Sequence, residues 1–219
     1  WPKRTYVHCI DQDKSLTYGD LYSVSNQAAQ FLKSYDIQAN DRVLLLAENS
    51  VENLAVFISV LRYGATLATV HVEMNQSHLS EIINAIAPKI VLYQEGLGLE
   101  DLQENAPGVW LELGEWEYDK YKATGWFAEI AALSDEDNIK TVASPDDHGV
   151  IFYTSGTVAK PKGVIQTHAT AYFNYDATAD YLQLAPGDKT FDCRSYSWLS
   201  AQHMSLGAPL VAGATTIIT

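Results

Sequence analysis

Three apolar runs of strand length alternate with amphipathic segments in the first 93 residues, and this alternation constrains the fold more than any other feature of the sequence. The runs are residues 42–47, 65–72 and 89–93. Continuous apolar runs are typical of strands that helices cover on both faces of a parallel sheet. Strand, helix and strand in this order predict right-handed βαβ units. The sequence therefore predicts an α/β fold, with doubly wound βαβ layers and a largely parallel sheet over residues 1–93.

Local signals place the helix ends within this layer. A short β-rich run, Thr5–Ile10, comes first, and Thr17 with Asp20 then matches a capping box at a helix start. Ser50 is placed to cap the next helix, and Gly64 follows that helix as a stop signal. The first helix is expected to end near residue 35, and a third helix to run over 77–87.

Composition and charge exclude several classes of protein. The chain has 219 residues, of which 47% are hydrophobic and 19% are charged, and this profile excludes intrinsic disorder. Its 14 basic and 27 acidic residues give a net charge of −13. Nucleic acids and anionic membrane surfaces are therefore disfavoured as partners. A small anionic ligand stays open, because backbone N–H groups can hold phosphate in an acidic protein.

The cysteines and the apolar stretches indicate the compartment. Cys9 and Cys193 lie far apart and are expected to be two buried free thiols, without a disulfide or a zinc site. The longest apolar stretch, Leu206–Ile218, is too short to span a bilayer and contains proline and glycine. No signal peptide precedes the first strand-like run, so we expect a cytoplasmic protein.

Residues 94–145 have weaker patterns and are predicted to form an irregular connecting region. Three tryptophans, at positions 110, 116 and 126, lie in it. We expect them to pack in the core, although an aromatic binding platform is an alternative. The segments Asp135–Asp137 and Asp146–His148 are expected to be solvated acidic turns and not metal sites.

The chemistry is expected in the third part, residues 146–219, which begins with a β-rich run and continues into Thr154–Val164. Its glycines permit backbone shapes that turn N–H groups toward an anion, and its hydroxyls and lysines bind phosphate oxygens. The candidate phosphate ligands are Thr154, Ser155, Gly156, Thr157, Lys160, Lys162 and Gly163. The alternative is a solvated loop whose lysines face water. Pro161 rules out a Walker motif, and Asp101 rules out a dinucleotide fingerprint after Gly96.

Residues 153–164, YTSGTVAKPKGV, closely resemble the signature YTSGTTGKPKGV of adenylate-forming enzymes. That superfamily contains acyl- and aryl-CoA synthetases, luciferases and the adenylation domains of peptide synthetases. Further segments resemble family motifs in the same order, and the resemblance covers residues 1–219. They are Leu16–Leu21, Asn40–Val43, Asn49 and Ser50 with Tyr63–Ala65, Asp147, and Leu210–Ala214.

The resemblance implies an AMP-forming acid–CoA ligase that uses ATP, magnesium (Mg2+) and CoA. In that reaction a carboxylic acid attacks the α-phosphate of ATP, and CoA then takes the acyl group. Thr154, Ser155, Gly156, Thr157 and Lys162 would line the phosphates, and Thr157 would also touch Mg2+. An adenylation domain that loads a carrier protein, and a non-catalytic relative, remain alternatives.

The resemblance also implies that the chain is the incomplete N-terminal domain of such an enzyme. The partner would be the missing C-terminal domain of the same enzyme, and a homodimer stays open. We expect the chain to be inactive alone, and we expect a sheet that ends at residues 215–219 to expose an apolar edge.

The sequence departs from the family pattern at two places. Val158 and Ala159 replace the usual Thr-Gly, which weakens ATP use by one hydroxyl contact and favours the non-catalytic alternative. Trp198 stands where many members have a histidine near the acyl channel, with Gln202 and His203 one turn later. We assign these three residues to the acyl pocket, with a core tryptophan as the alternative for Trp198. His203 is not needed as a base, and His168 is expected to cap a helix.

Overall fold

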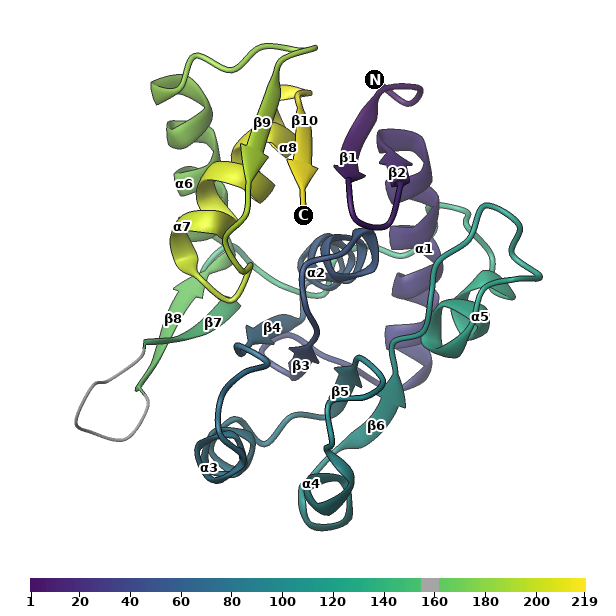
Figure 1. Ribbon diagram of the computed structural model, residues 1–219, viewed down its shortest axis with the longest axis vertical. Coiled ribbons are helices and arrows are strands. Elements are labelled where there is room, and N and C mark those ends of the chain that lie inside the picture. Colours follow the sequence, from purple (N-terminus) through teal and green to yellow (C-terminus); the bar gives the residue numbers. More distant parts are fainter. Residues whose placement is uncertain (155–161) are drawn as a thin grey trace.

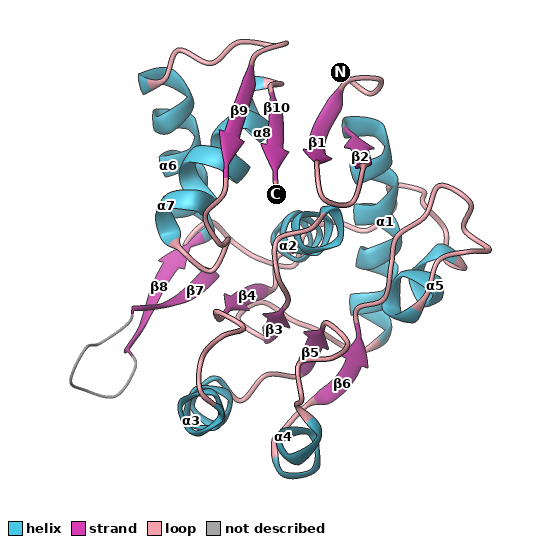
Figure 2. Ribbon diagram, in the orientation of Figure 1, coloured by secondary structure: helices cyan, strands magenta, loops and turns pink. Residues whose placement is uncertain are grey.

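The computed structural model describes residues 1–154 and 162–219, and in them two β-sheets lie on either side of shared helices (Figures 1 and 2). The larger sheet has the strand order β6-β5-β3-β4-β7-β8, and the smaller has the order β2-β1-β10-β9. The strands are β1 Thr5–Cys9, β2 Lys14–Thr17, β3 Arg42–Leu46, β4 Thr66–Thr69, β5 Ile90–Tyr93, β6 Val109–Glu112, β7 His148–Thr154, β8 Lys162–Thr167, β9 Lys189–Asp192 and β10 Thr215–Ile218. The helices are α1 Tyr18–Ser34, α2 Val51–Tyr63, α3 Gln76–Ile86, α4 Glu100–Asn105, α5 Gly125–Ala131, α6 His168–Tyr181, α7 Leu199–Ala201, the π-helix η1 Gln202–Gly207 and α8 Ala208–Ala212.

The larger sheet is parallel except for one pair. Strand β3 pairs in parallel with β4 and β5, β4 with β7, and β5 with β6, while β7 and β8 form an antiparallel hairpin. Val43 and Leu45 pack with α1, α2 and α5 on one face, whereas Leu44 and Leu46 pack with α3 and α4 on the other. The doubly wound α/β fold is therefore confirmed, because helices cover both faces of this sheet.

The capping signals are confirmed where the sequence placed them. The Thr17 side chain accepts a hydrogen bond from Asp20 N, and the Asp20 carboxylate accepts one from Thr17 N at 3.0 Å. Ser50 caps α2 through Asn53 N. Gly64 ends α2 with φ +103°, and a Cβ there would lie 2.7 Å from Ala143 N, so the position requires glycine.

The smaller sheet corrects the expectation of an exposed apolar edge. Strand β10 lies between β1 and β9 and pairs in parallel with both, so its backbone is hydrogen-bonded on both sides. The edge strands of this sheet are β2 and β9. The expectation was wrong because the pairing of β10 with β1 joins residues about 210 positions apart, which local patterns do not reveal.

The region 94–145 is more regular than the expected connection, and this expectation is corrected in part. It contains α4, α5 and the edge strand β6, which extends the larger sheet beside β5. Its tryptophans pack as predicted: Trp126 is 1% exposed and Trp116 is 8% exposed. Strand β6 was missed although Val109, Trp110 and Leu111 are consecutive apolar residues, because so short a run does not by itself distinguish a strand from a connection.

The two cysteines differ in their exposure. Cys9 is a buried free thiol, as expected, but Cys193 is exposed because it directly follows the last residue of β9. No helix among the described residues has both the length and the apolar character that crossing a bilayer requires.

Candidate functional site

The β7–β8 hairpin carries the signature segment. The last residue pair in its register is Thr154 with Lys162, so the strands flank residues 155–161 on both sides. Ser155, Gly156, Thr157 and Lys160, together with the Mg2+ assignment of Thr157, lie outside the described residues. Lys162 is exposed at the first position of β8. Because β7 runs parallel to β4, the hairpin extends from the carboxyl edge of the sheet, where α/β folds place ligands.

Gly163 and Tyr153 form a close pair across this hairpin. They are register partners, and a Cβ on residue 163 would lie 3.1 Å from Tyr153 Cζ and 3.2 Å from its hydroxyl. Burial raises the pKa of the Tyr153 phenol. The glycine lets the ring of Tyr153, the first residue of the signature, lie close to the partner backbone.

The opposite end of the hairpin is held by Asp147, at the amino end of β7. Its carboxylate accepts hydrogen bonds from Ser144 N at 2.7 Å and from Asn40 Nδ2 at 2.6 Å. These bonds hold the pKa of Asp147 below its usual range, the backbone bond from Ser144 being the largest cause. Asn40 also accepts a bond from His148 N, so one side chain fixes the entry of β7.

A cavity of about 810 Å³ lies beside the carboxyl ends of β4 and β7. It joins residues that directly follow β4, residues at the end of β7 and the turn that leads into α7 (Figure 1). Its lining residues are Thr69, Val70, His71, Glu73, Met74, Asn75, His78, Phe152, Tyr153, Ser197, Trp198, Leu199 and Ser200. The contribution of His71 and His78 was missed from the sequence. Their position after a buried parallel strand was the available signal.

Trp198 is 56% exposed and lines this cavity. The alternative of a core tryptophan is therefore wrong, because Trp198 precedes α7 and is not inside a buried helix. The position of Trp198 in the lining of this cavity agrees with the prediction that it lines an acyl pocket.

Gln202 and His203 do not line this cavity. Gln202 is fully buried and reaches the cavity only through Thr69, whose Oγ1 accepts a bond from Gln202 Nε2 at 3.1 Å. His203 stacks edge-on against Tyr175, and its Nε2 lies 3.4 Å from Gln166 Oε1. Burial lowers the pKa of His203. Both side chains lie against protein neighbours and not in this cavity, so their assignment to the acyl pocket stays a prediction.

His168 does not cap α6 with its side chain. It is the first residue of the helix, and the cap is Thr167, whose hydroxyl accepts a bond from Thr170 N at 3.1 Å. Burial lowers the pKa of His168. The expected cap was displaced by one residue.

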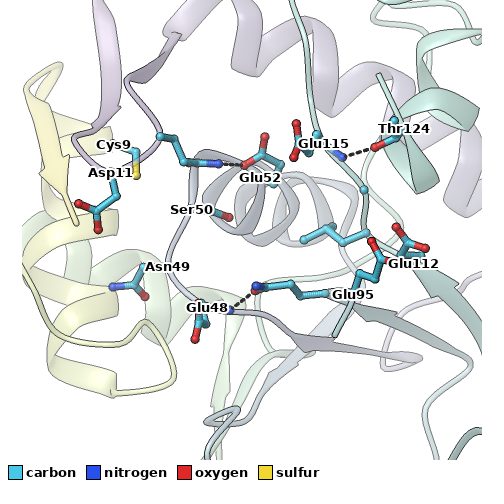
Figure 3. Close-up of a pocket in the computed structure, with 14 residues that line it drawn as sticks. Cys9, Asp11, Glu48, Asn49, Ser50, Glu52, Glu95, Glu112, Glu115 and Thr124 are labelled. Atoms are coloured by element: carbon cyan, nitrogen blue, oxygen red, sulfur yellow. Dashed lines mark hydrogen bonds between the residues drawn. The ribbon is translucent and has the colours of Figure 1, made fainter. Parts of the chain in front are cut away.

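A second cavity, of about 460 Å³, lies at the carboxyl ends of β3, β5 and β6 (Figure 3). It is lined by the acidic residues Asp11, Glu48, Glu52, Glu95, Glu112 and Glu115. Of these, Glu52 is buried and paired with Lys14 at 2.9 Å. Among the described residues, no three histidines, cysteines or acids are placed to hold one metal ion. Like charges repel a polyphosphate, so electrostatics favour the hairpin side of the sheet edge for nucleotide binding.

Comparison with known proteins identifies the family. A family model described as AMP-binding enzyme matches residues 1–219. The chain belongs to the AMP-binding enzyme family. The resemblance drawn from residues 153–164 is thereby confirmed, together with the α/β fold class.

Members of the AMP-binding family with differing activities are similar to this chain. It is 27% identical to the 3-hydroxybenzoate–CoA/4-hydroxybenzoate–CoA ligase of Thauera aromatica, covering 99% of this chain and 41% of that protein. It is 24% identical to gramicidin S synthase 2 of Brevibacillus brevis, covering 74% of this chain and 3% of that protein. ATP-bound MatB from Rhodopseudomonas palustris superposes with a TM-score of 0.85 at 22% identity, over 100% of this chain and 42% of that chain. This chain therefore spans less than half the length of these three relatives.

Proposed function

We propose that this chain provides the phosphate-binding hairpin and part of the acid-binding pocket of an AMP-forming acid–CoA ligase. The observation that carries the proposal is the cavity of about 810 Å³ directly beside the hairpin. Tyr153 belongs to both, because it lines the cavity and is the first residue of the signature. A carboxylic acid in the cavity would therefore lie next to a nucleotide held by the hairpin.

The proposed reaction has two steps. A carboxylate oxygen attacks the α-phosphorus of ATP, an O–P bond forms, and the bond to pyrophosphate breaks. The CoA thiolate then attacks the acyl carbon and AMP leaves. Because the carboxylate is already a nucleophile, the protein's task is positioning and charge neutralisation. Lys162, with Lys160, would neutralise phosphate charge, and Mg2+ would supply further charge neutralisation through Thr157.

The walls of the cavity favour an aromatic or long apolar acid. Phe152, Tyr153 and Trp198 provide three aromatic rings, and Val70 and Met74 add apolar surface. Aromatic rings pack favourably against one another in offset or edge-on arrangements. The naming of the Thauera relative as a hydroxybenzoate–CoA ligase supports aromatic acids as the first class to test.

The test is carboxylate-dependent exchange of pyrophosphate into ATP, measured on the full-length gene product with a panel of benzoic, hydroxybenzoic and fatty acids. We expect exchange with at least one acid, and then CoA thioester formation after CoA is added. Absence of exchange across the panel, with MgATP still bound, would contradict the ligase and favour the non-catalytic alternative that Val158 and Ala159 suggest.

A second candidate function is the loading of a carrier protein. The similarity to gramicidin S synthase 2 favours it. The two functions differ in the acceptor, so a two-acceptor assay distinguishes them. A protein that forms the adenylate but leaves free CoA unacylated, while acylating a phosphopantetheinylated carrier, would be an adenylation domain.

A further inference from the structure

Asn49, which lies just beyond the end of β3, holds a segment 145 residues later in the chain. Its Nδ2 donates to Arg194 O at 2.8 Å, and its Oδ1 accepts from Tyr196 N at 3.0 Å. The NH2 group and the oxygen of the Asn49 amide therefore each bind a backbone group of the tripeptide 194–196. Figure 3 shows Asn49 at the edge of the acidic cavity, between the larger sheet and this segment.

Gln202 holds the same tripeptide from the other side. Its Nε2 donates to Tyr196 O at 2.7 Å and to Thr69 Oγ1 at 3.1 Å. Gln202 and Tyr196 are 0% and 1% exposed, so these bonds are shielded from water. The Gln202 Oε1 atom has no partner among the described residues, which indicates that the side chain contributes through its NH2 group alone. The backbone N–H and C=O of Tyr196 are therefore both fixed, one by each amide.

Trp198 is connected to the fixed tripeptide 194–196 by the hydrogen bonds of a tight turn. Trp198 N donates to Ser195 O at 3.0 Å, and Trp198 O accepts from Gln202 N at 3.1 Å. Arg194 adds a bond from Nη1 to Ser200 Oγ at 2.9 Å. The Trp198 side chain is half-exposed, yet its backbone is held at both ends. Hydrogen bonds between the Trp198 backbone and other residues therefore hold its ring in the cavity wall.

We infer that Asn49 and Gln202 are positioning residues that set acid specificity by fixing Trp198 against the ends of β4 and β7. The specificity part of this inference rests on the proposed function, whereas the positioning part does not. Thr69 connects Gln202 to the cavity, because Thr69 lines the cavity and accepts a hydrogen bond from Gln202. Loss of the Asn49 amide or the Gln202 amide would let the turn that carries Trp198 move relative to Tyr153. Neither loss removes a side chain that lines the acid-binding cavity.

The first test needs no activity. Amide hydrogen exchange at single-residue resolution is measured on the full-length gene product and on Asn49→Ala. We expect the Tyr196 amide to exchange about fivefold to tenfold faster in the variant, because its hydrogen-bond acceptor is gone. Gln202→Met keeps the side-chain volume but not the NH2 group, and we expect it to raise acrylamide quenching of Trp198 fluorescence. The Trp198 signal is the difference in fluorescence between proteins with and without Trp198→Phe.

Asn26→Ala is the matched control. Asn26 is also an asparagine whose amide joins distant segments, since it donates to Asp135 O at 2.8 Å and accepts from Arg62. It is 2% exposed, and these two hydrogen bonds do not involve residues 194–196. Asn26→Ala should reduce stability without raising Tyr196 exchange beyond the change in global unfolding. Equal Tyr196 exchange in the wild type and Asn49→Ala would overturn the positioning role.

The second test measures specificity. The ratio of kcat/KM for a large acid to that for a small acid is compared among the wild type, Asn49→Ala, Asn49→Asp and Trp198→Ala. We expect Asn49→Ala to shift this ratio at least threefold in the direction of Trp198→Ala, with KM for ATP unchanged. Asn49→Asp keeps an acceptor for Tyr196 N and should shift the ratio less, which provides the rescue arm.

The two tests separate the two hypotheses. An unchanged ratio in a variant whose Tyr196 amide is deprotected would overturn the specificity role. A wild type that adenylates no acid would refute the proposed function, while the exchange result still decides whether Asn49 positions the turn. If Asn49→Ala does not fold, Gln202→Met decides the positioning role through the acrylamide quenching of Trp198, and unchanged quenching would overturn it.

Discussion

The ring of Tyr153 lies close to Gly163 across the β7–β8 strand pair, where a Cβ on residue 163 would lie 3.1 Å from Tyr153 Cζ. Gly163→Ala is therefore expected to displace the ring toward the cavity that Tyr153 lines. We expect the free energy of unfolding to fall by about 1 kcal/mol, and KM for the acid to rise more than KM for ATP. Thermal unfolding and steady-state kinetics measure the two effects.

The neighbouring residue provides the control for Gly163→Ala. Val164 is 40% exposed on the same strand, so Val164→Ala should change the free energy of unfolding by no more than about 0.5 kcal/mol. A Gly163→Ala variant that behaves like Val164→Ala in both assays would show that the ring has room to accept the methyl group.

Lys162 is the described residue on which the proposed phosphate contacts depend most directly. It is exposed at the start of β8, so Lys162→Ala should leave the melting temperature unchanged. Loss of a charged hydrogen bond to phosphate is expected to lower kcat/KM for MgATP by about 10- to 100-fold. Lys189→Ala is the matched control, since Lys189 is also exposed but lies on β9 in the other sheet. Equal activity of both variants would refute the role of Lys162.

Two tryptophans are expected to behave in opposite ways. Trp198 is 56% exposed, so Trp198→Ala should leave the melting temperature almost unchanged while altering the order of preferred acids. Trp126 is 1% exposed and packs edge-on against Phe31 and Phe127, so Trp126→Ala should cost about 3–5 kcal/mol of stability. Exchange assays over the acid panel and urea unfolding distinguish them. An unchanged acid profile in Trp198→Ala would remove it from the pocket.

Features that depend on short stretches of chain were predictable from the sequence. The capping box of Thr17 and Asp20, the Ser50 cap and the Gly64 stop each involve groups within four residues of one another. The family was also predictable, because residues 153–164 resemble the family signature and the family model matches the chain. The doubly wound layer followed from the spacing of buried runs.

Features that depend on pairing between distant residues were not predictable. Strand β10 lies inside its sheet because it pairs with β1, and Gln202 does not line the cavity because it bonds to Tyr196 and Thr69 instead. Sequence counting placed Gln202 one helical turn from Trp198, but a count of turns does not reveal which neighbour a side chain meets. The role of Asn49 was hidden for the same reason, since its partners lie 145 and 147 residues away.

Asp192 links this positioning network to pH. Burial alone would raise its pKa, but hydrogen bonds from Arg194 and Ser205 and the charge of Arg194 outweigh burial, so the pKa of Asp192 is lowered. A carboxyl group whose pKa is lower when folded stabilises the protein fully above its unfolded pKa of about 3.9, and this contribution is lost as pH falls through the folded value.

Asp192→Asn should therefore be less stable than the wild type at pH 7, and the difference should shrink as the pH falls below about 4. Urea unfolding at pH 7, 5, 4 and 3 measures it, with Asp176→Asn, an exposed substitution on α6, as the control for net charge. Parallel stability curves for Asp192→Asn and the wild type would show that the folded pKa is not lowered.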